Sequence, residues 1–464
     1  MTKTRALFAP KDMTQGTPWK RIVEFTIPML IGNVAQQFYN TADSIIVGRY
    51  IGDNALAAVG SASPVFNLLL VLFVGVAVGA GIMVSQYFGA QDRENLSRTI
   101  GTCITLTVIT SVIIMIVGPL VSKPLLIYLK TPPTIINWCA GYLNILFLGI
   151  AGLAFYNILA GVLRGLGDSF SALVFLLIST ALNVGLDLLF VARFGMGVPG
   201  VAFATVIAQG ISAVFCLLKL LRMKDTFDLN WSMLKLNKKH SLTVMKLGLP
   251  SGLTQAVFSL AMIVVQSLTN SFGEMVIACN VIVMRVDGFA MMPNFSFGSA
   301  MTTFAGQNIG AQRLDRVEQG TKEGTKIAVT VSTIITILLL LFGKNLMSVF
   351  TDTAELVDLS MRMMRILAVG YIAMAVTQCL SGVMRGAGDT ITPMWISLIT
   401  VVFLRVPIAY TIAYFTRSDL YPTGRPESVF ISLLASWTLG AIITTIYFKK
   451  GAWRKKGLSK RIEL

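Results

Sequence analysis

"LAGVLRGLGDS" at residues 159–169 returns as "LSGVMRGAGDT" at residues 380–390, 221 positions further along the chain. A second pair of segments keeps the same offset, "QYFGAQ" at 86–91 and "QNIGAQ" at 307–312. Apolar segments often resemble one another by chance, but a constant offset across Gly, Gln, Arg and Asp positions does not arise in that way. The sequence therefore predicts an internal duplication, with two copies of one structural unit.

The composition is that of a membrane protein. Of the 464 residues, 55% are hydrophobic and only 13% are charged, and the mean hydropathy is +0.73. Soluble proteins carry about 25% charged residues. Apolar runs such as 68–84 and 327–343 are long enough to be membrane spans. Residues 1–21 are polar and basic and do not resemble a signal peptide, so the first span is expected to direct insertion.

We predict an all-α integral membrane fold with twelve transmembrane helices. The bilayer core contains no water, so the backbone N–H and C=O groups of a span must bond to one another, and an α-helix achieves this within a single segment. Six spans per copy is an even number, so both copies enter from the same side and form parallel repeats. The predicted domains are an N-lobe at 1–222, a cytoplasmic linker at 223–243 and a C-lobe at 244–464. The predicted spans are 22–47, 55–83, 99–119, 136–157, 169–191, 198–221, 244–269, 277–303, 326–343, 357–379, 391–415 and 428–448.

The distribution of Lys and Arg predicts the orientation. With both termini on one side, that side carries 27 basic residues and the opposite side carries 7. Because basic loops stay in the cytoplasm, both termini and the linker are expected there, in a multi-pass protein of the plasma membrane. The net charge of +16 is spread over loops and tails rather than concentrated on one soluble face, so no nucleic-acid partner is expected.

Two parallel halves can enclose a cavity that opens to either side, which makes an alternating-access transporter the first hypothesis. A channel is the alternative, but channels are more often assembled from identical subunits. The chain has no Walker A motif, nucleophile motif or cysteine–histidine metal motif, so we expect neither an enzyme nor a cofactor. An ion gradient would then drive transport.

Two local patterns predict structure rather than chemistry. Asp168 and Asp389 in the repeated phrase stand where they can cap the following helix. The glycines at the two ends of "GVAVG" (75–79) have the small-xxx-small spacing that lets helices pack closely.

Acidic residues deep in membrane spans are costly, and here they break the symmetry of the repeat. Asp43 lies in the first predicted span, and Asn183 and Asp187 share a face of the fifth. Oxygen ligands of this kind suit Na⁺, and closely spaced carboxylates equally suit a proton. A structural polar cluster is the alternative. The matching positions in the second copy are apolar: Val265, Leu404 and Ile408.

The second copy has a different set of unusual residues. The eighth span carries Arg285, Asp287 and a kink-prone Pro293, and the eleventh carries Arg405 without an evident partner. Arg285 and Asp287 could neutralise one another, or they could gate the transporter or contact its substrate. Met291 and the aromatic residues near it suit a pocket for amphipathic cations, although ordinary helix packing explains any single one of them.

The pattern resembles the multidrug and toxic compound extrusion (MATE) family over essentially the whole chain. The resemblance is carried by "IPMLIGNVAQQFYNTADSIIVGRYIGDNALAAVG" (27–60), by both repeated pairs and by "ALNVGLDLLF" (181–190). It implies a V-shaped pair of six-helix bundles that exports small amphipathic, cationic compounds in exchange for Na⁺ or H⁺. Such a protein is expected to work as a monomer in the lipid bilayer.

The resemblance also implies roles for individual residues. The coupling ion, Na⁺ or H⁺, would be held by Asp43, Asn183, Asp187 and Thr205. Substrate would contact a cavity to which the resemblance assigns Gln36, Tyr39 and Asn157, beside the Asp287, Arg285 and Met291 suggested by the sequence itself. The seventh and tenth spans lack the acids of another branch of the family. A lipid-linked oligosaccharide flippase of the wider superfamily is the alternative function, and it would need a cationic cavity.

Overall fold

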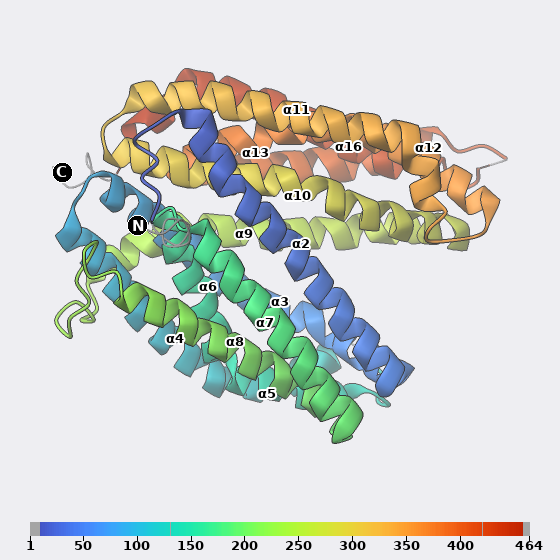
Figure 1. Ribbon diagram of the computed structural model, residues 1–464. Helices are drawn as coiled ribbons and strands as arrows, with labels where there is room; N and C mark the ends of the chain where they lie inside the picture. The colour runs from blue at the N-terminus through green and yellow to red at the C-terminus, as the bar shows by residue number, and fades with distance from the viewer. Residues whose placement is uncertain (1–9, 130, 420, 458–464) are drawn as a thin grey trace. The chain divides into compact units, whose positions relative to one another are not determined.

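The computed structural model describes residues 10–129, 131–419 and 421–457, and these fold into long helices (Figure 1). Across these ranges the β-type pairing is limited to one isolated bridge between Ser418 and Tyr421. The all-α prediction is therefore confirmed for the described part of the chain.

The first repeat supplies six spans, of which the fourth and fifth each consist of two helical segments. They are α2 (Pro18–Tyr50), α3 (Asp53–Gly89), α4 (Arg93–Tyr128), α5 (Ile136–Leu148) with α6 (Ile150–Gly165), α7 (Ser169–Asp187) with the π-helix η1 (Leu188–Arg193), and α8 (Gly197–Leu221).

The second repeat has the same order of elements, again with composite fourth and fifth spans. They are α9 (Lys238–Asn270), α10 (Glu274–Gly310), α11 (Leu314–Met347), α12 (Ala354–Ala368) with α13 (Gly370–Gly386), α14 (Ile391–Leu398) with the π-helix η2 (Ile399–Arg405) and α15 (Val406–Phe415), and α16 (Glu427–Lys450). A short 3₁₀ segment, η3 (Ala452–Lys455), follows.

The predicted count of spans agrees with these elements. Among the described residues, eight spans pass a test of length and hydropathy as unbroken helices, and two more pass it as bent pairs. The long helices α2 and α3 occupy the places of the first two spans. Most helices extend beyond the predicted apolar segments, since a helix that leaves the bilayer can continue in water.

The duplication is visible in backbone geometry as well as in sequence. Gln91 and Gln312 both adopt a left-handed conformation, with φ of 55° and 58°, at equivalent positions of the two related turns. The fourth span of each repeat is broken at its middle, by 54° between α5 and α6 and by 42° between α12 and α13. Non-glycine residues rarely adopt positive φ, so its recurrence at equivalent positions confirms the repeat.

The glycines of the repeated phrase explain why it occurs twice. A Cβ atom on Gly161 or Gly165 of α6 would lie 2.7 Å from the carbonyl oxygen of Ala77 or Gly81 of α3. In the second repeat, a Cβ atom on the equivalent Gly382 of α13 would overlap a backbone carbonyl of α10. Each repeat is thus built on a central helix pair that only glycine allows to approach so closely.

The described chain divides by packing into two compact units. Unit 1 contains residues 10–12 and 27–252, and unit 2 contains residues 13–26 and 253–457. The predicted lobes follow the repeat in sequence, whereas these units follow contacts, so their boundaries differ. The unit boundaries fall beside Pro28 in α2 and Pro250 in α9.

Both predicted capping aspartates are found in place. Asp168 accepts hydrogen bonds from the backbone nitrogen of Ser171 at 2.9 Å and from its hydroxyl at 2.6 Å, and it lies 3.6 Å from the amine of Lys219. Asp389 accepts from Thr392 in the same way. The phrase is therefore structural, since it packs one helix and caps the next.

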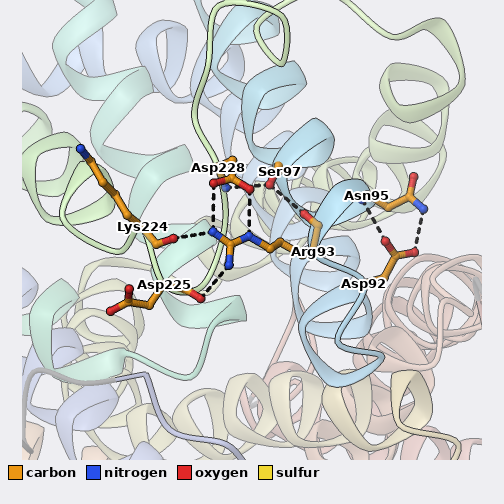
Figure 2. A network of polar contacts seen from close by, with 7 residues as sticks. All are labelled: Asp92, Arg93, Asn95, Ser97, Lys224, Asp225 and Asp228. Atoms are coloured by element: carbon orange, nitrogen blue, oxygen red, sulfur yellow. Dashed lines mark hydrogen bonds and ion pairs between the residues drawn. The ribbon is translucent and has the colours of Figure 1, made fainter.

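The linker between the repeats is fastened to the start of α4 (Figure 2). The guanidinium of Arg93 donates two hydrogen bonds to the carboxylate of Asp228, at 2.8 and 2.9 Å, and further bonds to the carbonyls of Lys224 and Asp225. The hydroxyl of Ser97 accepts from the backbone nitrogen of Asp228. The Arg93 guanidinium holds the pKa of the Asp228 carboxyl below its usual value.

Candidate functional site

Three helices of unit 1 meet at the hydroxyl of Thr205 on α8. The hydroxyl of Tyr39 on α2 donates to its oxygen at 3.4 Å. The amide nitrogen of Asn183 on α7 donates to the same oxygen at 3.5 Å. These residues are 166 and 22 positions from Thr205 in the chain, so the fold brings together side chains that the sequence only suggests as a group.

The two acids of the prediction lie beside this junction. Tyr39 and Asp43 are one helical turn apart on α2, and Asn183 and Asp187 are one turn apart on α7. The carboxyls of Asp43 and Asp187 are within hydrogen-bonding reach of one another. Asn183 and Asp187 are fully buried, with 0% exposure, and Asp43 is half-buried, so Asp187 is enclosed by unit 1 rather than facing lipid.

The cluster has more acceptors than donors. Within the described residues, five buried oxygens of the cluster have no hydrogen-bond partner. Two buried carboxylates without a cation beside them are unstable in a low-dielectric region. The oxygens are Oδ1 of Asp43, Oδ1 of Asn183, both carboxylate oxygens of Asp187 and Oε1 of Gln209.

This donor set fits a small hard cation or a proton. Carboxylate and amide oxygens are ligands for Na⁺, and a carboxyl pair can share a proton. The described chain holds no group of three or more His, Cys, Asp or Glu side chains that could bind a transition metal.

Two members of the cluster are absent from the prediction. Gln209 lies one turn after Thr205 on α8 and is 5% exposed. Its spacing of four residues from Thr205 is a signal that the sequence offers. Tyr142 on α5 is 8% exposed and interacts electrostatically with both acids. Nothing in the sequence spacing points to Tyr142, because α5 reaches the acids only through the packing of the unit.

The predicted cavity residues of the first repeat are only partly gathered. Gln36 is half-buried on the same side of α2 as Tyr39, one turn before it. Asn157 on α6 instead donates to the carbonyl of Leu153 in its own helix, at 2.9 Å. The structure thus places Tyr39 in the acid cluster and gives Asn157 a local contact. Their roles in binding substrate remain predictions.

The suggested pairing of Arg285 with Asp287 is wrong. The two residues are two positions apart on α10, and side chains at that spacing point to different sides of a helix. Arg285 is exposed and forms no ion pair within the described residues. Asp287 instead lies within hydrogen-bonding reach of the Tyr371 hydroxyl and interacts with Arg405, which is 2% exposed.

Unit 2 therefore has an acid and a buried arginine that interact electrostatically. Nη1 of Arg405 lies 3.4 Å from the sulfur of Met262, and Nε has no partner among the described residues. Met291, predicted in the substrate cavity, is 5% exposed and packs in the apolar core of this unit. The acid of the second repeat thus has an arginine near enough to interact with it electrostatically, whereas the interactions given for Asp43 and Asp187 include no arginine or lysine.

In both units a π-helical segment adjoins the charged residue of the fifth span. Asp187 immediately precedes η1, and Arg405 is the last residue of η2. The two segments are not at equivalent positions of the repeat. A π-helix shifts the register of the side chains that follow it and often occurs at functional sites.

Comparison with known proteins agrees with this duplicated architecture. The sequence model of the MatE family matches the chain twice, at residues 28–189 and 250–411. The chain belongs to the MatE family. The two matched segments begin 222 positions apart, which agrees with the repeat, and both prolines at the unit boundaries start a match. Asp43 and the Asn183–Asp187 pair fall in the first match, and Arg405 falls in the second.

Relatives of this MatE protein match it over nearly their full length. The probable multidrug resistance protein YoeA of Bacillus subtilis (strain 168) is 28% identical, over 96% of both chains. The probable multidrug resistance protein YpnP of the same organism is 29% identical, over 96% of this chain and 97% of its own. A crystal structure of a MATE protein in the straight conformation has a TM-score of 0.88 and 26% identity, over 96% and 98% of the two chains.

Proposed function

We propose that this protein is a secondary active multidrug antiporter, acting as a monomer in the plasma membrane with both termini in the cytoplasm. It exports amphipathic, cationic organic compounds in exchange for H⁺ or Na⁺. The observation that carries the proposal is the Asp43–Asp187 pair in unit 1, in which Oδ1 of Asp43 and both carboxyl oxygens of Asp187 are buried without a hydrogen-bond partner in the described structure. The names of the relatives support multidrug export, and membership of a transporter family argues against an enzyme.

The coupling ion would change the interaction between α2 and α7. With both carboxyls ionised, two like charges face one another in a low-dielectric region, which favours separation of the helices that carry them. A proton or Na⁺ between Asp43 and Asp187 removes that repulsion and draws α2 towards α7. Because Pro28 interrupts the hydrogen bonding of α2, the segment that carries Asp43 can respond without moving the whole helix.

Substrate and ion would then compete through α2. Gln36 and Tyr39 precede Asp43 on the same helix at spacings of seven and four residues, so the position of α2 sets theirs. Ion binding that shifts α2 would rearrange the surface that holds a cationic compound and promote its release. Such coupling between two sites is reciprocal, so substrate would also weaken ion binding.

The experiment is efflux of a cationic dye from cells, with membrane amounts matched between variants. Asp187→Asn and Asp43→Asn are expected to lose most of the efflux, because an amide can neither take up a proton nor carry the charge that attracts Na⁺. Asp53→Asn is the matched control, since Asp53 is exposed at the start of α3. Undiminished efflux by Asp187→Asn would refute the proposal.

Proteoliposomes under separately imposed Na⁺ and pH gradients would identify the ion. The gradient that drives uptake of dye in wild-type protein, and fails to do so in Asp187→Asn, is that of the coupling ion. Transport driven equally well without either gradient would exclude antiport.

The positions of the two arginines predicted to lie deep in the membrane, Arg285 and Arg405, argue against the alternative function, a lipid-linked oligosaccharide flippase. Such a flippase would use cationic side chains to hold a pyrophosphate. Arg405 is buried and interacts electrostatically with Asp287, which leaves Arg285 as the exposed member of the two arginines that the sequence suggests. A lipid-flipping assay without dye transport would reverse this preference.

A further inference from the structure

The chain just before α2 is held to the end of α10 and the start of α11 by buried backbone contacts. Met13 is fully buried, with 0% exposure. Its backbone nitrogen donates to Oε1 of Gln307 at 2.8 Å, and its carbonyl accepts from Nδ2 of Asn308 at 3.2 Å and from Nη2 of Arg316 at 3.1 Å. Connecting segments normally run over the surface, where water satisfies their backbone, so this segment is specifically bound.

Arg316 is the centre of this contact. It is 8% exposed and binds two carbonyls of the segment, that of Met13 and, through Nη1 at 2.8 Å, that of Gly16. Its Nε donates to Oδ1 of Asn308 at 3.1 Å, which fixes the plane of the guanidinium. Gly16 has a φ of 78°, a conformation that favours glycine, and the turn at this residue lets one guanidinium reach both carbonyls. A lysine ammonium has no planar fork of this kind.

The first turns of α2 continue the same contact. The backbone nitrogen of Trp19 donates to Oε2 of Glu323 on α11 at 2.9 Å. Ile22 is fully buried, and its Cδ1 lies 3.2 Å from the position of a Cβ atom on Gly324, also on α11. Together, residues 13–22 form an anchor segment within unit 2.

The side chains that hold the anchor segment are peculiar to the second repeat. The positions 221 residues before Asn308 and Arg316 carry Tyr87 and Asn95. Asn95 bonds to Asp92 of its own turn. A side chain needed only to build the turn between the second and third spans of a repeat would be expected in both copies. Arg316 therefore serves a purpose beyond that turn.

The anchor segment is one end of a helix that the two units share. Residues 13–26 belong to unit 2, whereas residues 27–50 of α2, with Asp43, belong to unit 1. Pro28 lies at this change, where the hydrogen bonding of the helix is interrupted. An ion that moves the part with Asp43 bends α2 at Pro28 only if the other end is held. A helix that is not held would shift as a whole.

We propose that Arg316 is a positioning residue for ion-driven transport, because it holds the anchor segment in unit 2 and so confines the movement of α2 to the part that carries Asp43. The inference rests on the proposed function, in which an ion at Asp43 and Asp187 moves α2. Arg316 belongs to unit 2 and the two acids belong to unit 1. Loss of Arg316 is therefore expected to leave ion binding intact and to separate it from the release of substrate.

Hydrogen exchange of the full-length protein in detergent would test the anchor segment itself. In Arg316→Gln, the protection of residues 13–22 is expected to fall about tenfold or more, as loss of a charge-assisted hydrogen bond implies. Arg316→Lys is expected to restore little of it, because an ammonium keeps the charge without the fork. Lys322→Gln is the matched control, since Lys322 is an exposed cation of the same helix. Wild-type protection in Arg316→Gln would overturn the proposal.

Ion-driven transport would test the link between the anchor segment and coupling. Proteoliposomes would receive the gradient that drives dye transport by wild-type protein. Ion binding would be followed as the ion-dependent rise in melting temperature that Asp187→Asn lacks. Arg316→Gln is expected to lose most of the transport and to keep that rise. Wild-type transport despite a loosened anchor segment, or loss of the rise together with transport, would contradict the proposed role.

Failure of the proposed function would give a different result. Wild-type protein would then show no response of dye transport or melting temperature to either ion, whereas hydrogen exchange would still report on the anchor segment. Gel filtration would show that each variant is folded. Gln307→Met removes the acceptor of the Met13 nitrogen without removing a charge, so it gives a second variant that should loosen the same segment and lower the same transport.

Discussion

Gly79 offers a direct test of how tightly α3 and α9 pack in unit 1. A Cβ atom at Gly79 would overlap the carbonyl oxygen of Val244 and lie 2.9 Å from the backbone nitrogen of Gly248. Both neighbours are backbone atoms, so no side chain can rotate away, and the two helices would have to separate. Overpacking of this kind costs about 1–3 kcal/mol. The close approach is the one that the "GVAVG" spacing predicts.

Gly60→Ala in the same helix isolates that cost. Nothing lies within 4 Å of a Cβ atom placed at Gly60. Both substitutions replace a helical glycine by alanine and gain up to about 1 kcal/mol of helix propensity, so this gain cancels in the comparison. The difference between the two variants is the packing cost alone.

Thermal unfolding of the two variants in the same detergent gives the measurement. One kcal/mol shifts the melting temperature by about 2–4 °C in a body of 150–250 residues, so Gly79→Ala is expected to melt roughly 2–12 °C below Gly60→Ala. Equal melting temperatures would show that α3 and α9 are not in the close contact described here. A higher value for Gly79→Ala would refute the packing argument altogether.

Three further predictions concern charged residues. Asp168→Ala removes a helix cap, with an expected cost of about 0.5–2 kcal/mol that thermal unfolding would detect. Because Arg93 lowers the pKa of Asp228, the linker contact is present at neutral pH and is lost as the pH falls through that lowered value. The protection of residues 222–237 against hydrogen exchange, relative to the intrinsic rate at each pH, should therefore fall in acid, and Asp228→Asn should show low protection already at neutral pH. Arg405→Gln removes the cation that interacts electrostatically with Asp287, so it is expected to lower the folded yield in detergent, and adding Asp287→Asn should restore most of that yield.

Local patterns were sufficient to predict much of the fold. The repeat offset, the apolar runs and the capping aspartates depend on neighbouring residues and on spacing, and each is confirmed in the described structure. The grouping of Asp43 with Asp187 also follows from comparing the two copies, because only the first places acids there. In a duplicated chain, each copy can thus be compared with the other, and a position that is charged in one copy and apolar in the other is easily recognised.

Other features depend on packing between segments that are distant in the sequence, so local sequence patterns do not predict them. The breaks in the fourth and tenth spans occur within continuous apolar stretches, so hydropathy predicts a single straight helix there. The π-helical segments have no marker in composition, and the electrostatic interaction between Asp287 and Arg405 joins residues more than a hundred positions apart. Pairing Arg285 with Asp287 from sequence proximity ignores the direction in which helical side chains point.

The contrast between the two buried acidic sites bears on how a MatE protein of this kind would be driven. In unit 2, Asp287 interacts electrostatically with the buried Arg405, although no ion pair or hydrogen bond joins the two among the described residues and Oδ1 of Asp287 also lacks a partner. In unit 1, Asp43 and Asp187 have unpaired oxygens and no arginine or lysine hydrogen-bonded to them in the described structure. A low-dielectric site with two acids and no fixed cation must either take up a positive charge or separate its helices. This asymmetry supports the proposal that the coupling ion binds in the first repeat.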